Sequence, residues 1–241
     1  MMAGVLSLLA IASASNVQAE DKKPDNEVTG NVSLTTDYRF RGISQTRVQP
    51  ALQGGVDYTH NPTGFYLGAW ASTIKWVKDA GGSTDIELDL YGGKKGEIAK
   101  DVSYDVGGLA YVYAGNGLNP SANTFEIYGQ LGYGPAYIKY SHTLTNAFGF
   151  ADSKNSGYFD LGANIDLGSS YTLNLHLGHQ VVKRNSAFNY TDYKVGVTKD
   201  FGVCSVSAAV IGGDSKAYVG PGVDGKNLSK AAVVLAVSKT F

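Results

Sequence analysis

The feature that most constrains the fold is an alternation of polar and apolar residues that recurs along most of the chain. From Val28 to Phe40 the even positions are mostly apolar, whereas the odd positions are polar and continue through Asp37, Arg39 and Arg41. Successive side chains of a β-strand point to opposite faces, so a period of two separates the residues into two surfaces. Each such segment therefore predicts a strand with one apolar and one polar face.

About 12 segments follow this pattern, and most have about 9–11 residues, the length of a tilted strand that crosses an outer membrane. Strands of ordinary globular proteins average about 5–6 residues. The composition agrees, because 31 glycines, 16 tyrosines and only 6 prolines favour strands and turns over helices. The segments lie near 28–40, 50–60, 64–74, 84–93, 102–113, 124–132, 135–143, 157–167, 171–182, 191–200, 202–211 and 231–241.

The connections between these segments alternate between short turns and long polar loops. Those after the even-numbered segments are short, as at Asn61-Pro62-Thr63, and only 94–101 is longer. The long loops, after the odd-numbered segments, are 42–49, 75–83, 114–123, 144–156, 183–190 and 212–230. This sorting is typical of a transmembrane β-barrel with short periplasmic turns and long extracellular loops. We therefore expect one antiparallel up-and-down outer-membrane barrel over 28–241, with both termini on the periplasmic side.

The chemistry of a bilayer decides which face of these strands points outward. In hydrocarbon each unpaired backbone N–H or C=O costs several kcal/mol, so only helices and closed barrels cross a membrane. The apolar face of a membrane barrel meets lipid and the polar face lines the interior, whereas a soluble barrel of the lipocalin kind inverts this arrangement. The charge on the polar face, the sorting of the loops and the length of the strands favour the membrane barrel, so Val32, Leu34, Tyr38 and Phe40 are expected to face lipid.

The N-terminal segment 1–19 predicts a cleavable export signal. Its apolar run, 3–14, is too short to span a bilayer as a helix, which takes about 20 residues. Small residues at Val17 and Ala19 suit an exporting peptidase, so we expect cleavage after Ala19. The usual Lys or Arg before the apolar run is missing, and a buried N-terminal helix is the alternative. Segment 20–27 is polar and predicts disorder.

The last strand ends the chain in AAVVLAVSKTF, and Phe241 shares a face with Val233, Leu235 and Val237. A final strand that closes on Phe resembles the signal that bacterial outer-membrane proteins present to the barrel-insertion machinery. Lys239 lies on the same face, where an apolar residue is more usual. We expect Phe241 to be the insertion signal and the location to be the bacterial outer membrane.

Six stretches of the chain carry a family likeness: TTDYRFRGISQT, PALQGGVDY, GFYLGAWAS, IELDLYGG, VSYDVGGLAYVY and FEIYGQLGY. Together they resemble a bacterial family of TorF-type porins, also described as outer-membrane conserved hypothetical proteins. The likeness covers most of the mature chain and is densest from Asn31 to Tyr140. It implies an outer-membrane β-barrel and leaves the transported substrate unassigned.

The predicted interior face is mixed in charge and tilts toward acid. Because rings of Asp and Glu favour cations, we expect a porin for passive diffusion of small solutes or ions that prefers cations. About 8 strands leave an interior filled by side chains and about 16–18 leave an aqueous channel, so an open pore and a closed barrel held by a salt-bridge plug are both compatible. The candidate pore-lining residues are Asp37, Arg39, Arg41, Asp57, Asp85, Glu87, Asp89, Asp105, Glu126, Lys139, Asp160, Asp166, Asp192 and Lys194.

Other functional classes find less support. A lipid-modifying enzyme needs a nucleophile beside a base, but Ser141 and His142 are strand neighbours whose side chains point to opposite faces. The net charge of −1 gives no basic footprint for nucleic acid, and the four histidines and single Cys204 show no metal-motif spacing, so we expect neither metal nor other cofactor. The expected partners are outer-membrane lipid and small solutes or ions. A structural or adhesive barrel stays open as an alternative, as do the oligomeric state and the role of loop 212–230.

Overall fold

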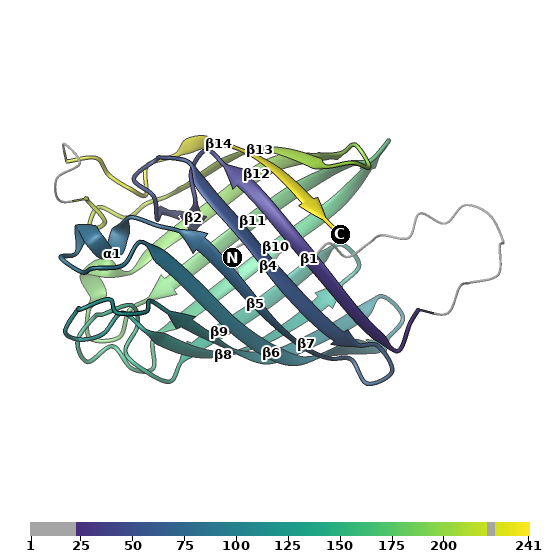
Figure 1. The fold of residues 1–241 in the computed structure, drawn as a ribbon, viewed down its shortest axis with the longest axis horizontal. Helices are drawn as coiled ribbons and strands as arrows, with labels where there is room; N and C mark the ends of the chain where they lie inside the picture. The colour runs from purple at the N-terminus through teal and green to yellow at the C-terminus, as the bar shows by residue number, and fades with distance from the viewer. Residues whose placement is uncertain (1–22, 221–224) are drawn as a thin grey trace.

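The computed structural model describes residues 23–220 and 225–241, and within them twelve strands close into one antiparallel barrel (Figure 1). The expected up-and-down barrel of about 12 strands is confirmed. The barrel strands are β1 (Asn26–Thr35), β4 (Ala51–His60), β5 (Phe65–Thr73), β6 (Ile86–Ala99), β7 (Val102–Val112), β8 (Thr124–Tyr133), β9 (Ala136–Thr143), β10 (Gly157–Gly168), β11 (Tyr171–Val181), β12 (Tyr190–Asp200), β13 (Ser205–Gly213) and β14 (Ala232–Thr240).

Each barrel strand pairs with its neighbours in chain order, and the ring closes where the first strand meets the last. There β1 and β14 run antiparallel, with Asn31 opposite Thr240 and Leu34 opposite Val237. Closure gives every barrel strand a partner on both sides, so the wall has no free edge. A bilayer imposes this condition on any sheet that crosses it.

Strand β6 shows how the sequence alternation divides the two faces of the wall. Ile86 and Leu90 are exposed on the outside, whereas Glu87 and Asp89 are buried on the inside. The same division recurs around the ring, where many large apolar side chains remain exposed on the outer face, as a lipid-facing surface requires. Outward-facing examples are Val32 at 42%, Leu34 at 58%, Leu67 at 60%, Leu161 at 54%, Val195 at 53% and Val233 at 67%.

The connections are sorted by length between the two ends of the barrel, as expected. Short turns join one end at 61–64, 100–101, 134–135, 169–170 and 201–204, and long loops join the other at 36–50, 74–85, 113–123, 144–156, 182–189 and 214–231. The turn predicted at 94–101 is wrong, because β6 continues to Ala99. The helices α1 (Trp76–Asp79) and η1 (Ser186–Phe188) belong to the second and fifth long loops. Figure 1 shows α1 at the long-loop end.

No helix among the described residues is long and apolar enough to cross a membrane.

The first strand is shorter at its outer end than the alternation predicts. It begins at Asn26, inside the segment expected to be disordered, and ends at Thr35 rather than near Phe40. The next residues, 36–50, turn into the barrel and form two short strands, β2 (Arg39–Phe40) and β3 (Ile43–Ser44). We call residues 36–50 the inward loop. The predicted signal segment 1–19 lies outside the described residues.

The inward loop corrects the expectation that Tyr38 and Phe40 face lipid. Both are buried, with 3% and 9% of their surface exposed. Tyr38 packs edge-on against Trp70 of β5 at 5.6 Å between ring centroids, and Phe40 packs edge-on against Tyr111 of β7 at 5.5 Å. The two rings belong to an aromatic core inside the barrel. The alternation therefore continues past Thr35, but its apolar face meets interior aromatic residues in place of lipid.

Candidate functional site

The centre of the inward loop is a tight hairpin whose tip reaches β12, three strands along the ring from β1. Phe40 pairs with Ile43, so that only Arg41 and Gly42 form the turn, with φ of 46° and 77°. Two residues with positive φ define a type I′ turn, which favours glycine in the second position. A Cβ added to Gly42 would stand 2.4 Å from Cβ of Asp192 on β12, so the tip contacts the wall there. We call residues 39–44 the inward hairpin.

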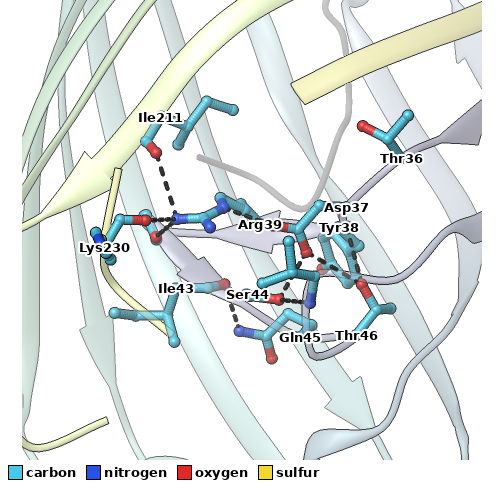
Figure 2. A network of polar contacts seen from close by, with 12 residues as sticks. Thr36, Asp37, Tyr38, Arg39, Ile43, Ser44, Gln45, Thr46, Ile211 and Lys230 are labelled. Carbon is cyan, nitrogen blue, oxygen red and sulfur yellow. Dashed lines mark hydrogen bonds and ion pairs between the residues drawn. The ribbon is translucent and has the colours of Figure 1, made fainter. Parts of the chain in front are cut away.

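Arg39 connects the inward hairpin to β13 and to the last long loop. Its Nε donates to Oδ2 of Asp37 at 2.7 Å. Its Nη1 donates to the backbone carbonyls of Gly42, Ile211 and Lys230, at 3.2, 3.3 and 2.8 Å (Figure 2). The carbonyl of Ile211 belongs to β13, and that of Lys230 to the last long loop. Arg39 therefore joins the hairpin to the wall mainly through backbone acceptors.

Asp37 organises the loop from within. Its Oδ1 accepts hydrogen bonds from the hydroxyl of Ser44 at 2.6 Å and from that of Thr46 at 3.2 Å. The backbone N–H of Tyr38 donates to the same Thr46 hydroxyl at 3.1 Å (Figure 2). Because its carboxylate also accepts from Arg39, Asp37 holds both arms of the loop together. These contacts satisfy polar groups that would otherwise be buried without a partner.

Arg41 crosses the interior and binds the far wall with the planar end of its side chain. Its Nη2 donates to Oε2 of Glu126 on β8 at 2.7 Å, and its Nη1 donates to Oε1 at 3.1 Å. The same Nη1 donates to Oε1 of Gln180 on β11 at 2.7 Å. The guanidinium lies over the rings of Phe40 and Tyr158, at 4.7 and 4.2 Å from their centroids. This paired contact with a buried carboxylate is the geometry that arginine favours over lysine.

Glu87 and Asp89 make an acidic stretch of wall beside the inward loop. Glu87 accepts from the hydroxyls of Tyr38 at 2.7 Å and Tyr113 at 2.9 Å. Asp89 is 2% exposed, and its Oδ1 has no hydrogen-bond partner among the described residues. A buried carboxylate oxygen without a partner carries a desolvation penalty that a cation would relieve.

Tyrosines accompany the acidic residues farther down the barrel. The hydroxyl of Tyr91 donates to Asp57 at 2.6 Å, and that of Tyr66 donates to Asp105 at 2.6 Å. The hydroxyl of Tyr66 also bonds that of Tyr128. This half of the interior is therefore lined by phenol hydroxyls and carboxylates rather than by apolar side chains.

A second cluster lies on β10, β11 and β12. His176 stands between two carboxylates, with Nδ1 at 2.8 Å from Asp160 and Nε2 at 2.7 Å from Asp192. The hydroxyl of Tyr158 donates to Asp192 at 2.8 Å. Because Asp192 also touches the tip of the inward hairpin, this cluster forms part of the wall against which the hairpin rests.

The space left beside Arg41 is small. A cavity of about 10 Å³ lies there, between Arg41 and the side chains of Lys139, Ser141 and Asp160. Holding one water takes about 10–15 Å³. Lys139 itself is buried and lies over the ring of Tyr128, with Nζ at 3.9 Å from its centroid. The inward hairpin thus fills most of the interior at this level.

The structure brings most of the predicted residues to the interior, although their role in lining a pore stays a prediction. Three of them, Asp37, Arg39 and Arg41, were expected on the first strand and instead lie on the inward loop. Those on the wall, buried or half-buried, are Asp57, Glu87, Asp89, Asp105, Glu126, Lys139, Asp160, Asp192 and Lys194.

Two predicted residues lie at the rims of the barrel rather than in its buried interior. Asp85 precedes β6 and pairs with Lys78 at 2.6 Å, with half of each side chain exposed. The hydrogen bond from Lys78 lowers the pKa of Asp85. Asp166 is exposed near the end of β10, where it accepts from the backbone N–H of Gly168 at 2.7 Å. Both have the parity of the interior face, but they lie close to strand ends, where water replaces the barrel wall.

The predicted pore-lining residues are all charged, so the prediction omitted the neutral side chains that contact Arg41. Tyr158 shares the polar face of β10 with Asp160, and Gln180 lies on the polar face of β11, so strand parity could have found them. Phe40 was assigned to the lipid face. The pairing of Arg41 with Glu126 joins residues 85 positions apart, and no local pattern in the sequence carries it.

The hydrogen bonds of His142 bear on the enzyme alternative. Its ring lies on the outer face, where Nδ1 is 3.1 Å from the hydroxyl of Tyr140 and Nε2 is 3.2 Å from Oδ1 of Asn155. Ser141 is buried on the inner face. The serine and histidine therefore point apart, as predicted. Among the described residues, no group of three His, Cys, Asp or Glu side chains could hold a metal ion.

Comparison with known proteins gives one family and several similar folds. The model of a bacterial protein family of unknown function, Gcw_chp, matches residues 18–241. This supports the expected family of uncharacterised bacterial proteins, whereas the TorF designation stays a prediction. A comparison with curated protein sequences gave no match.

Among solved structures, the KdgM porin in complex with disordered oligogalacturonate is similar in fold, with a TM-score of 0.55 and 7% identity over 89% of this chain and 97% of that chain. The Acinetobacter baumannii protein OccAB3 has a TM-score of 0.42 and 12% identity, over 92% and 66% of the two chains. Outer membrane phospholipase A from Escherichia coli, as an active-site mutant, has a TM-score of 0.46 and 10% identity, over 93% of each chain. The first of these likenesses shows a porin-like outer-membrane barrel fold.

Proposed function

The chain belongs to the Gcw_chp family of bacterial proteins, and we propose that it is an outer-membrane porin whose passage is closed by the inward loop. Its location in the outer membrane is supported by the porin-like fold and by the apolar outer face. The proposed activity is passive diffusion of small solutes or ions, with a preference for cations.

The observation that carries this proposal is that a loop, and not the wall itself, fills the interior at the level of Arg41. The inward loop enters the interior after β1, Arg41 at the tip of its hairpin contacts Glu126 on β8, and the cavity beside Arg41 is about 10 Å³. Its polar anchors, such as Arg39 to Lys230 and Arg41 to Glu126, are hydrogen bonds that water can replace. A closing element of this kind can leave without unfolding the barrel, because it contributes no strand to the closed ring.

The preference for cations rests on the wall that the loop covers. The acidic wall residues Asp57, Glu87, Asp89, Asp105, Glu126, Asp160 and Asp192 outnumber Lys139 and Lys194 among the predicted positions. Arg41, which now pairs with Glu126, belongs to the inward loop and departs with it, whereas Arg39 pairs with Asp37 of the same loop. The unpartnered oxygen of Asp89 is a further place for a cation. A negative lumen concentrates cations and excludes anions.

The second candidate is a closed structural barrel, which the small cavity beside Arg41 favours. Planar-bilayer recording separates the two. Replacing residues 39–44 by a flexible Gly-Ser linker gives a conducting barrel if the loop is a removable plug. A folded variant that carries no more current than wild type would favour the structural barrel. Folding is checked by the shift in gel migration on boiling that membrane barrels show.

For insertion, we propose that Phe241 is read by the barrel-insertion machinery. Its side chain is 71% exposed on the outer face, and its backbone N–H and C=O both pair with Gly30 of β1. The terminal residue therefore stands at the seam where the ring closes. Deleting Phe241 is expected to slow insertion into membranes while leaving refolding in detergent intact, which time-resolved gel-shift assays measure.

A further inference from the structure

The pocket that holds Arg41 has an organisation of its own, independent of the inward hairpin. The carboxylate of Glu126 is held by the hydroxyl of Tyr111, which donates to Oε2 at 3.2 Å. The side-chain amide of Gln180 donates to the backbone carbonyls of Gly157 at 3.1 Å and Val181 at 3.2 Å. These bonds fix the amide so that its Oε1 points at the guanidinium. All of these groups belong to the barrel wall and remain there when the hairpin leaves.

The acceptors match one class of cation. The two oxygens of Glu126 receive Nη1 and Nη2 side by side, and Gln180 receives a further N–H of Nη1. The ring of Tyr158 covers the flat face of the group, at 4.2 Å from the ring centroid. A planar cation with paired donors fits this arrangement, whereas an ammonium group is a compact point charge that cannot make the paired contact and stack at once.

Arg41 is an imperfect occupant of this pocket. Its Nε is buried and has no hydrogen-bond partner among the described residues. Its backbone is in the left-handed region, with φ of 46°, which a residue with a side chain rarely adopts. An unpaired buried donor and a strained backbone both weaken the docked state. A free solute that binds the same acceptors does not carry the backbone strain.

We propose that this pocket is a binding site for guanidinium-bearing solutes, and that Arg41 occupies it as an internal stand-in that such solutes displace. The proposal rests on the proposed passage and names its substrate class. A solute that takes the place of Arg41 on Glu126 and Gln180 removes the anchor at the tip of the inward hairpin. Binding of the solute and opening of the passage are then the same event.

Chemical rescue of Arg41→Ala tests the site directly. The variant lacks the anchor, so planar-bilayer recording in potassium chloride is expected to show a current well above that of wild type. Guanidinium chloride added to the bath then fills the vacated pocket and reduces the potassium current in a saturable manner. Urea, which has nearly the same shape without the charge, and ammonium, which has the charge without the shape, are expected to leave the current unchanged.

Two further variants locate the effect. Arg41→Ala combined with Glu126→Gln keeps the shape of the pocket but removes its charge, and the concentration of guanidinium needed for half block is expected to rise about tenfold. Arg47→Ala is the matched control, because Arg47 lies in the same loop but pairs with Asp79 of α1 at 2.6 Å. It is expected to keep the current of wild type and to show no guanidinium block.

The outcomes separate the site from the passage. A folded Arg41→Ala barrel that stays closed overturns the claim that displacement of Arg41 opens the passage, whereas the barrel with residues 39–44 replaced tests the passage itself. A barrel that conducts, but is blocked equally by guanidinium and ammonium or by neither, overturns the guanidinium site and leaves the passage standing. Equal block with and without Glu126→Gln overturns the site as well.

A measurement on the wild-type protein keeps the test decisive if Arg41→Ala does not fold. Millimolar guanidinium is expected to speed cleavage by chymotrypsin after Tyr38 and Phe40, which are buried while the hairpin is docked. Urea at the same concentration is expected to have no effect on this cleavage. A rate that guanidinium does not change, or that urea changes equally, would contradict displacement of Arg41.

Discussion

The barrel wall and the inward loop use the same alternation of polar and apolar residues for opposite purposes. On the wall, as at Leu34 and Leu161, the apolar face is exposed to lipid and the polar face is buried. In the inward loop, Tyr38 and Phe40 pack in an aromatic core inside the barrel. The alternation determines which residues share one face of a strand. The hydrogen-bond partners of the backbone determine whether that face meets lipid or the interior of the barrel. A strand bonded on both sides belongs to the wall, whereas the inward hairpin bonds mainly to itself and to side chains.

The largest change we expect comes from weakening the inward loop at Phe40. Phe40→Ala removes the edge-to-face contacts with Tyr111 and Phe148, at 5.5 Å each. Loss of a buried Phe costs about 3–5 kcal/mol, here of the docking of the loop rather than of the barrel. Trypsin cleavage after Arg39 and Arg41 should accelerate strongly while the boiling shift in gel migration stays as in wild type. Loss of that shift would show that the loop is part of the barrel's own stability.

A charge placed on the outer face of the wall should instead lower the stability of the barrel itself. Leu161→Arg places a charge on the lipid face near the middle of β10, which destabilises a membrane barrel by about 2–4 kcal/mol. Urea unfolding in lipid vesicles measures the loss. Val203→Arg is the matched control, because Val203 lies in a turn at 71% exposure and should change stability little. Equal losses at the two positions would contradict a lipid-facing wall.

A smaller effect is expected at the tip of the hairpin. Gly42→Ala introduces a Cβ at φ of 77° and 2.4 Å from Cβ of Asp192. The left-handed backbone alone costs about 1–2 kcal/mol for a residue with a side chain. The docked loop should therefore loosen less than in Phe40→Ala, with a modest rise in trypsin cleavage. Unchanged cleavage would show that the tip does not rest on the wall.

The smallest effect is expected outside the barrel, at the exposed pair of Lys78 and Asp85. The pKa of Asp85 is lowered by the hydrogen bond from Lys78, so the pair favours the folded loop above the ordinary pKa of Asp, and the effect is lost as the pH falls through the lowered value. Lys78→Ala should raise the pKa of Asp85, measured by NMR titration, because the hydrogen bond that lowers it is lost. Conductance and unfolding temperature should not change measurably, because exposed ion pairs contribute little.

Period-two alternation was sufficient to predict the barrel, its strand count and the sorting of its loops. It placed Glu87, Asp89 and Glu126 correctly on the inner face because the face of a strand is a local property. It failed where a strand ends, at Thr35, because the end depends on neighbouring strands far away in the sequence. Asp85 was expected on a strand for the same reason, although β6 begins only at Ile86.

One local signal of the inward hairpin was present in the sequence. Arg41-Gly42 stands between Phe40 and Ile43, and a two-residue turn with glycine second, flanked by apolar residues, is typical of a hairpin. The contact of Arg41 with Glu126 had no such signal. It depends on the closed ring, which brings β8 opposite the first loop. The chemistry of the candidate site therefore follows from the fold rather than from a motif.

The barrel in which a Gly-Ser linker replaces residues 39–44 shows whether a removable loop covers a preformed lumen with an acidic wall. In a gradient of potassium chloride across a planar bilayer, we expect this variant to conduct, with a reversal potential that shows selectivity for potassium over chloride. A folded variant that does not conduct, or one that selects chloride, would contradict this expectation.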